Sequence, residues 1–158
     1  MTTEKLHVTI GQVKVAKAGQ SLHAILGSCI GIGFLFAERG VYGLAHCLLS
    51  KSQTQATGLS GRHVDSAISS LSSMMSLTPA DRRKVGVFLA GGANMTMPDD
   101  TDPKRLVGQV NSAFALKTLK EAGFRIRYDD LGGNTGRQVT INCNDGTYAI
   151  AKIPRLGG

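Results

Sequence analysis

The first fifty residues carry a pattern of hydrophobic and polar positions that predicts β-strands. Residues 6–16 (LHVTIGQVKVA) alternate well enough to form a strand. Residues 22–36 are apolar on both sides, which indicates a second, buried strand. Glu38-Arg39-Gly40 is a turn, and residues 41–49 (VYGLAHCLL) follow it as a third strand. We expect the second and third strands to pair as a hairpin.

Helical spacing follows residues 50–61, a polar, glycine-containing stretch that we expect to be a mobile loop. Asp65 suits the first turn of the helix, because negative charge is favoured at a helix N-terminus. Thr78-Pro79 ends this helix or starts a new turn. The apolar residues of the helix recur at spacings of three, four and seven: Val64, Ala67, Ile68, Leu71 and Met75.

A second helix is predicted from about Asp102 to Ala122. Asp102 can cap it, Pro103 fits its first position, and Gly123 suits its C-terminal cap. Four apolar residues are expected on its buried side: Val107, Val110, Phe114 and Leu119.

Four short apolar runs complete the pattern of predicted strands. They cover residues 85–90, closed by Gly91-Gly92, and residues 124–128, 138–143 and 147–152. Asn144-Asp145-Gly146 is a strong hairpin turn between the last two. The order of elements predicts an α+β fold, a single layered domain over residues 1–158. We expect mixed and antiparallel β-sheets, with two main α-helices packed on the outside.

Composition and cysteine usage indicate a reduced globular protein. The chain has 158 residues, of which 42% are hydrophobic and 18% charged. The sequence shows no N-terminal apolar segment and no long apolar span, so we expect neither export nor membrane insertion. The three cysteines match no disulfide or zinc framework, which favours a cytoplasmic location.

The net charge of +7 is compatible with nucleic acid or with an acidic protein partner. The basic residues are scattered, and only 5% of the residues are aromatic. No basic stripe with interleaved aromatic residues is visible, so the sequence disfavours nucleic-acid binding.

Cys29 and His46 are the residues with the clearest chemical potential. They lie on strands expected to be neighbours, where a thiol and an imidazole can meet. A cysteine thiolate attacks carbonyl carbons, and a nearby histidine assists it. Gly27 would let the chain turn sharply before the cysteine. The alternative is structural, because an isolated cysteine or histidine in an apolar strand is often part of the core.

Several motifs resemble the chemoreceptor glutamine deamidase family, CheD. They are LGSCIGI at 26–32, GLAHCLLS at 43–50, GRHVDSAI at 61–68, LAGGANM at 89–95, VGQVN at 107–111 and DLGGNTGRQV at 130–139. The likeness extends along most of the chain. It implies a protein-glutamine glutaminase in which Cys29 forms a thioester with a receptor glutamine, and His46 activates the thiol and protonates the departing ammonia. Receptor glutamate methyl esters could be hydrolysed through the same intermediate.

The resemblance also implies partners and the absence of a cofactor. The partners are methyl-accepting chemotaxis receptors and, where present, a CheC-type phosphatase. No metal or organic cofactor is implied, and no nucleic acid. We expect a monomer in the cytoplasm, located at receptor arrays.

One position departs from the family pattern. Six residues before its cysteine the family carries a threonine proposed as a third catalytic member, and this chain has His23 there. His23 could replace the threonine by orienting His46. Alternatively, Ser21 or another group could serve, or the site could be weakened or retuned.

Other residues have subsidiary expected roles. The backbone N–H groups of Ser28 and Cys29 are candidates for an oxyanion hole. Gly27, Asn134 and Arg137 are candidates for support of the substrate cleft. We expect Cys47 and Cys143 to be core residues. A metal site built from His23, Cys29 and His46 is an alternative that no ligand spacing supports.

Two rival functions belong to other classes. The first is a mainly non-catalytic regulatory module that binds chemoreceptors or the phosphatase, which the departure at His23 brings into consideration. The second is a cysteine peptidase, which would share the nucleophile but not the surrounding motifs.

Overall fold

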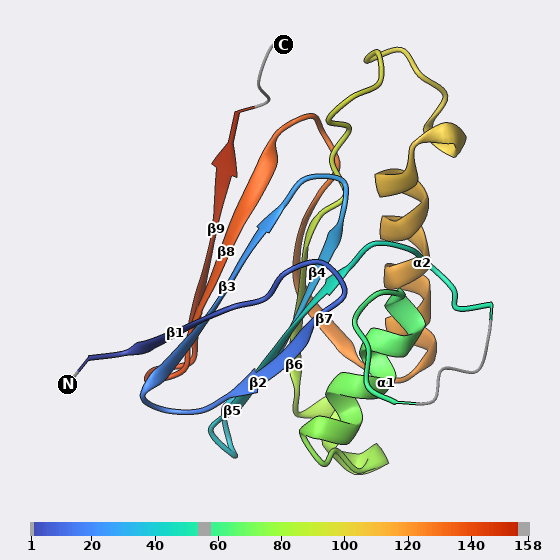
Figure 1. Ribbon diagram of the computed structural model, residues 1–158. Helices are drawn as coiled ribbons and strands as arrows, with labels where there is room; N and C mark the ends of the chain where they lie inside the picture. The colour runs from blue at the N-terminus through green and yellow to red at the C-terminus, as the bar shows by residue number, and fades with distance from the viewer. Residues whose placement is uncertain (1, 54–57, 155–158) are drawn as a thin grey trace.

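A computed structural model describes residues 2–53 and 58–154, and these form three layers (Figure 1). A four-stranded sheet lies on one side, a five-stranded sheet lies in the middle, and two α-helices cover the outer face of the middle sheet. The prediction of an α+β fold with mixed sheets and external helices is therefore confirmed.

The four-stranded sheet has the order β1-β3-β8-β9, and only its β1–β3 pair is parallel. The five-stranded sheet has the order β2-β5-β4-β6-β7, and only its β6–β7 pair is parallel. The strands are β1 (Glu4–His7), β2 (Val13–Ala16), β3 (Gln20–Leu26), β4 (Ile30–Phe36), β5 (Val41–Cys47), β6 (Gly86–Gly91), β7 (Arg125–Leu131), β8 (Gly136–Asn142) and β9 (Thr147–Ile153). The helices are α1 (Val64–Met74) and α2 (Val107–Glu121), and the 3₁₀ turns are η1 (Pro79–Arg83) and η2 (Pro103–Arg105).

Two predicted strands are each two strands in the structure. Residues 6–16 divide at a turn around Gly11, which has a φ of 85° and suits a residue without a Cβ. Residues 22–36 divide at a bend over residues 27–29. Each break carries the chain from one sheet to the other. Each break holds one residue of the core between the two sheets, Val8 or Cys29. The apolar positions on either side therefore resemble one continuous strand, and hydrophobicity alone does not show where a strand ends.

Both predicted hairpins are confirmed. Strands β4 and β5 pair antiparallel with Gly31 opposite His46. Strands β8 and β9 pair through the Asn144-Asp145-Gly146 turn, where Gly146 has a φ of 74°.

The first helix is confirmed, with Asp65 in its first turn and a buried apolar side. The loop prediction at 50–61 falls partly on residues 54–57, which lie outside the described residues. The described part of that segment contains no helix or strand.

The second helix differs from its prediction. Asp102 caps the short turn η2 by accepting from the Lys104 N–H (3.0 Å), and α2 begins only at Val107. Val107 and Val110 are 47% and 45% exposed, so their predicted burial is wrong. The helix is instead oriented by the close approach of its backbone at Gly108 to the backbone at Gly92. A Cβ at Gly108 would lie 2.4 Å from the Gly92 carbonyl oxygen. The buried positions of α2 are Gly108, Asn111, Ser112, Ala115 and Leu119.

Two apolar cores lie on the two faces of the middle sheet. Ile30, Ile32 and Phe34 of β4 face the helices, whereas Leu26 and Phe88 belong to the core between the sheets. The glycines of β4 face this second core. A Cβ at Gly33 would lie 2.0 Å from the Phe88 ring, so the glycine leaves the space that the ring fills.

Candidate active site

Cys29 lies in the bend between β3 and β4, where the chain passes from one sheet to the other. Its side chain belongs to the core between the sheets, and the residue is 6% exposed. Two backbone hydrogen bonds hold the bend: Gly92 N–H donates to the Cys29 carbonyl (2.9 Å), and Ala93 N–H donates to the Gly27 carbonyl (3.0 Å). Burial raises the pKa of the Cys29 thiol, so the neutral thiol is favoured at neutral pH.

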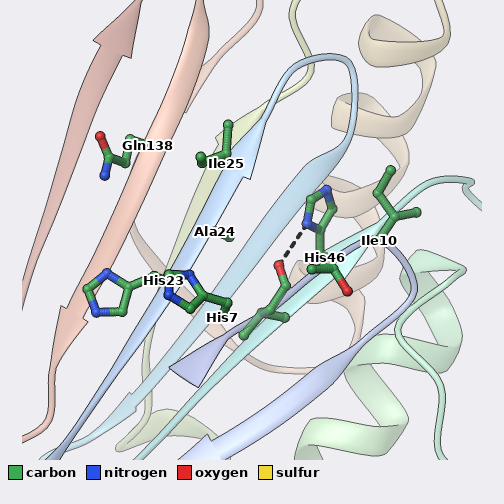
Figure 2. A pocket seen from close by; sticks show the side chains of 9 residues that line it. His7, Ile10, His23, Ala24, Ile25, His46 and Gln138 are labelled. Carbon is green, nitrogen blue, oxygen red and sulfur yellow. Dashed lines mark hydrogen bonds between the residues drawn. The ribbon is translucent and has the colours of Figure 1, made fainter. Parts of the chain in front are cut away.

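His46 lies on β5 directly opposite Gly31, and it is 4% exposed. Its Nδ1 lies 3.0 Å from the Val8 carbonyl oxygen, a contact that Figure 2 shows as a dashed line. A carbonyl can only accept, so Nδ1 carries the proton and Nε2 of the neutral ring keeps its lone pair. Burial lowers the pKa of His46, and the bond to Val8 opposes this in part. The imidazole is therefore neutral at pH 7 and able to accept a proton.

Cys29 and His46 are placed on one face of the hairpin, on either side of Gly31. Cys29 precedes Gly31 by two residues but lies in the bend before β4, outside the paired residues of the hairpin. The separation of about 7–8 Å between diagonal neighbours applies to residues inside a regular antiparallel pair. No hydrogen bond joins the thiol and the imidazole within the described part of the chain. The Leu26 side chain covers Gly31, where a Cβ would lie 2.7 Å from Leu26 Cδ1.

The side chain of His23 does not hydrogen-bond to His46. Its Nε2 contacts Ser21 Oγ (2.7 Å), and its ring lies 5.5 Å from the His7 ring, on the side of the cavity away from His46 (Figure 2). The backbone of His23 does contribute, because its carbonyl accepts from the Val8 N–H (2.7 Å). Of the three interpretations at this position, the geometry favours orientation of His46 by another group, the Val8 carbonyl.

A cavity of about 350 Å³ opens beside His46. Its wall combines three histidines with apolar residues, of which Ile10 and Ile25 are 58% and 69% exposed. Cys29 is not among its lining residues. Sequence reasoning missed most of this wall, because it follows from the break at residues 8–12 and the pairing of β3 with β8. The lining is His7, Val8, Thr9, Ile10, His23, Ala24, Ile25, His46 and Gln138.

The backbone before Cys29 suits an oxyanion hole in one respect. Within the described structure, neither the Ser28 nor the Cys29 N–H donates to another residue. The expected role of Gly27 changes, however. Its φ lies outside the left-handed region, and a Cβ there would lie 3.1 Å from Met95 Cγ, so close packing accounts for the glycine.

Asn134 and Arg137 lie apart from the cavity beside His46. Asn134 lines a second cavity, of about 300 Å³, next to the start of α2. Arg137 is 3% exposed and pairs with Asp130, with 3.1 Å between Nη2 and Oδ1. It therefore acts inside the protein rather than on its surface.

The remaining cysteines lie in the two cores. Cys47 is fully buried on the helix side of the middle sheet, as the alternation from His46 predicts. Cys143 is buried in the core between the sheets, where burial raises the pKa of its thiol to about 11. Over residues 2–53 and 58–154, no three His, Cys, Asp or Glu side chains gather as metal ligands. No helix in the same ranges is long and apolar enough to cross a membrane.

The lowered pKa values of two histidines determine how the stability of the fold should depend on pH. The pKa values of His46 and His23 are lowered in the folded protein, mainly by burial, from about 6.5 in the unfolded chain. As pH falls below about 6.5 the unfolded chain binds protons first, so the free energy of unfolding decreases. We expect His46→Gln to flatten this decrease in urea unfolding at pH 7.5, 6.5 and 5.5. An equal slope in wild type and variant would contradict the assignment.

A cysteine thiol beside a neutral imidazole is the side-chain pair used by many hydrolases that pass through an acyl-enzyme. Comparisons with known proteins identify the family to which the chain belongs. Residues 48–152 match the model of the family described as CheD chemotactic sensory transduction. This chain belongs to the CheD family. Cys29 and His46 precede this matched range.

Three relatives illustrate the range of similarity. A protein of Ruegeria sp. (strain TM1040), named probable chemoreceptor glutamine deamidase CheD 2, is 53% identical over 98% of this chain and 95% of its own. Probable chemoreceptor glutamine deamidases CheD of Bdellovibrio bacteriovorus and Methanococcus maripaludis (strain C5) are each 34% identical. They cover 94% and 96% of this chain, and 95% and 97% of their own lengths.

Proposed function

We propose that this chain is a protein-glutamine glutaminase that converts glutamines of methyl-accepting chemotaxis receptors to glutamates. The observation that carries the proposal is the placement of Cys29 and His46 on one face of the β4–β5 hairpin, with Nε2 of His46 able to accept a proton. The names of the relatives, which are receptor glutamine deamidases, supply the substrate class.

The reaction begins from the neutral pair, because burial favours the thiol of Cys29 and the uncharged ring of His46. Nε2 of His46 accepts the thiol proton as Sγ attacks the amide carbon of a receptor glutamine. The tetrahedral intermediate collapses to a thioester, and the amide nitrogen leaves as ammonia with the proton from His46. Water then attacks the thioester with His46 as base, which gives glutamate and the free thiol.

The surroundings support this reaction in distinct ways. The N–H groups of Ser28 and Cys29 would bind the oxyanion. The cavity beside His46, with His23 in its wall, would be the entry for the glutamine side chain, whose amide would pass beyond the lining residues to reach Cys29. Asn134 and Arg137 would support the loops around the turn at Gly27. The same steps would hydrolyse a receptor glutamate methyl ester, with methanol as the leaving group.

The biological setting is part of the same proposal. The chain would act as one domain over residues 1–158, as a monomer in the cytoplasm at receptor arrays. A CheC-type phosphatase would be a second partner. The reaction proposed here needs no metal or organic cofactor.

His23→Thr tests which group orients His46. The Val8 carbonyl fixes Nδ1, and position 23 contributes to that bond through its main chain. We therefore expect the substitution to change kcat by less than about fivefold. The main-chain hydrogen bonds remain after the substitution, and they keep the imidazole in place. Steady-state ammonia release is the measurement. A loss of two orders of magnitude would place the orienting role in the His23 side chain.

The test of the function is ammonia release from the cytoplasmic fragment of a cognate chemoreceptor, with gel analysis of the same samples. The proposal predicts ammonia without any shortening of the receptor. Cleaved receptor would indicate a cysteine peptidase instead.

One observation favours a second function. Cys29 is almost completely buried and has no hydrogen bond to His46, which is the arrangement expected of a regulatory binding module that no longer catalyses. Such a module would bind the receptor fragment or the phosphatase with normal affinity and release no ammonia. Measuring binding and ammonia release on the same protein separates the two functions.

A further inference from the structure

Arg137 is a buried cation that contacts no substrate in the steps above. Besides its ion pair with Asp130, its Nη2 donates to the Gly132 carbonyl (3.1 Å), and its Nη1 donates to the Thr135 carbonyl. Replacing a buried ion pair by apolar side chains is often neutral for stability. The pair is therefore better explained by the geometry that it imposes on residues 130–135.

Backbone hydrogen bonds connect this loop to the turn that carries Cys29. The N–H of Gly132 donates to the Gly91 carbonyl (2.9 Å). The next residue, Gly92, donates its N–H to the Cys29 carbonyl (2.9 Å). No flexible side chain intervenes between the Gly132 carbonyl held by Arg137 and the main chain of Cys29.

The strand register provides a second connection. Arg137 of β8 lies opposite Leu26, the last residue of β3 before the turn. The Leu26 side chain packs over Gly91, where a Cβ would lie 3.2 Å from Leu26 Cβ. Arg137 therefore lies beside the point where the chain leaves the four-stranded sheet at the end of β3. It also hydrogen-bonds to residues 130–135, which contact Gly91 beside the turn.

We propose that Arg137 is a positioning residue for Cys29, which holds the turn through the 130–135 loop and the glycines at 91–92. The proposal rests on the proposed function only in taking Cys29 as the nucleophile. A lysine at 137 would keep the charge but would lose the planar fork that reaches Asp130, Gly132 and Thr135 together.

Two measurements on Arg137→Lys test the proposal. In steady-state ammonia release we expect kcat to fall on the order of 10²-fold, because small displacements of reacting groups are costly. KM should stay within about twofold, since the docking surface is unchanged. Alkylation of Cys29 by iodoacetamide across pH, mapped by mass spectrometry, should become faster with its midpoint at lower pH. The reason is that a loosened turn relaxes the burial that raises the pKa of the thiol.

Arg39→Lys is the matched control. Arg39 also pairs with an aspartate, Asp81 (3.2 Å), and donates to the carbonyls of Met75 and Ser76 (3.2 and 3.3 Å). These contacts lie at the end of α1, away from the Cys29 turn. We expect wild-type kcat and a wild-type alkylation profile.

A double variant keeps the test decisive if Arg137→Lys does not fold. Arg137→Met with Asp130→Leu removes both charges and leaves no ion unpaired. It should show the same fall in kcat and the same shift in Cys29 alkylation. Wild-type kcat and alkylation in a folded variant would overturn the positioning role, even if the wild type deamidates receptors. The wild type could release no ammonia while the variants still show shifted alkylation of Cys29. That result would uphold the positioning role of Arg137 and contradict the proposed function.

Discussion

We expect Cys29→Ala to abolish ammonia release from the receptor fragment, with kcat lowered on the order of 10⁴-fold or more. The proposed thioester cannot form without Sγ, and removing the nucleophile from comparable hydrolases leaves only the small contribution of binding and oxyanion stabilisation. Receptor binding should be unchanged, because Cys29 is 6% exposed and offers little surface to a partner. Steady-state ammonia release and receptor affinity, measured on the same preparation, check both parts.

Cys143→Ala is the control for the loss of a buried thiol. Cys143 is 3% exposed in the same core between the sheets, and its thiol is likewise buried and neutral. The variant should lose some stability as a core truncation and retain full kcat. Equal activity in Cys29→Ala and Cys143→Ala would exclude a thiol nucleophile at position 29.

We expect His46→Gln to lower kcat on the order of 10³-fold while the fold persists. The glutamine amide can still donate to the Val8 carbonyl, so the main reason for the placement of the side chain is retained. It cannot accept the thiol proton or return it to ammonia, and general acid–base catalysis contributes about 10²–10⁴-fold. In the wild type the acid limb of kcat/KM should lie below pH 6.5, because the pKa of His46 is lowered. The variant should lose this limb.

His63→Gln controls for the loss of an imidazole. His63 precedes α1 and makes no side-chain cap bond there, and it does not line the cavity beside His46. Its kcat and pH profile should match those of the wild type. If His46→Gln kept more than about a tenth of the activity, a general base other than His46 would be required.

Local sequence patterns predicted the type of most elements, because the periodicity and the turn signals lie within each element or hairpin. The β4–β5 hairpin and the α1 helix are examples. The break at residues 8–12 was missed, and residues 22–36 were predicted as one strand although a sharp turn was expected at Gly27. Each break keeps one buried residue, Val8 or Cys29, and the change of sheet depends on long-range pairing that a local window does not contain.

The sequence named the side chains of the candidate site, whose catalytic roles stay predictions, but not its main-chain contacts. The hairpin register brings Cys29 and His46 to one face, as the sequence suggested. The orienting carbonyl of Val8 has no sequence signal, because every residue carries a carbonyl and only the fold selects one. The exposure of Val107 and Val110 was missed for a similar reason. Close packing at Gly108 sets the rotation of α2 more strongly than its apolar residues do.

The most direct test of the account is residue-resolved mass spectrometry of a chemoreceptor fragment incubated with the wild-type protein in water enriched in oxygen-18. Hydrolysis of a thioester places one solvent oxygen in the product, so each converted glutamine should gain about 3 Da. The proposed mechanism predicts this gain at discrete glutamines, together with one ammonia per site. A folded wild-type protein that binds the receptor and leaves every glutamine at its original mass would contradict it.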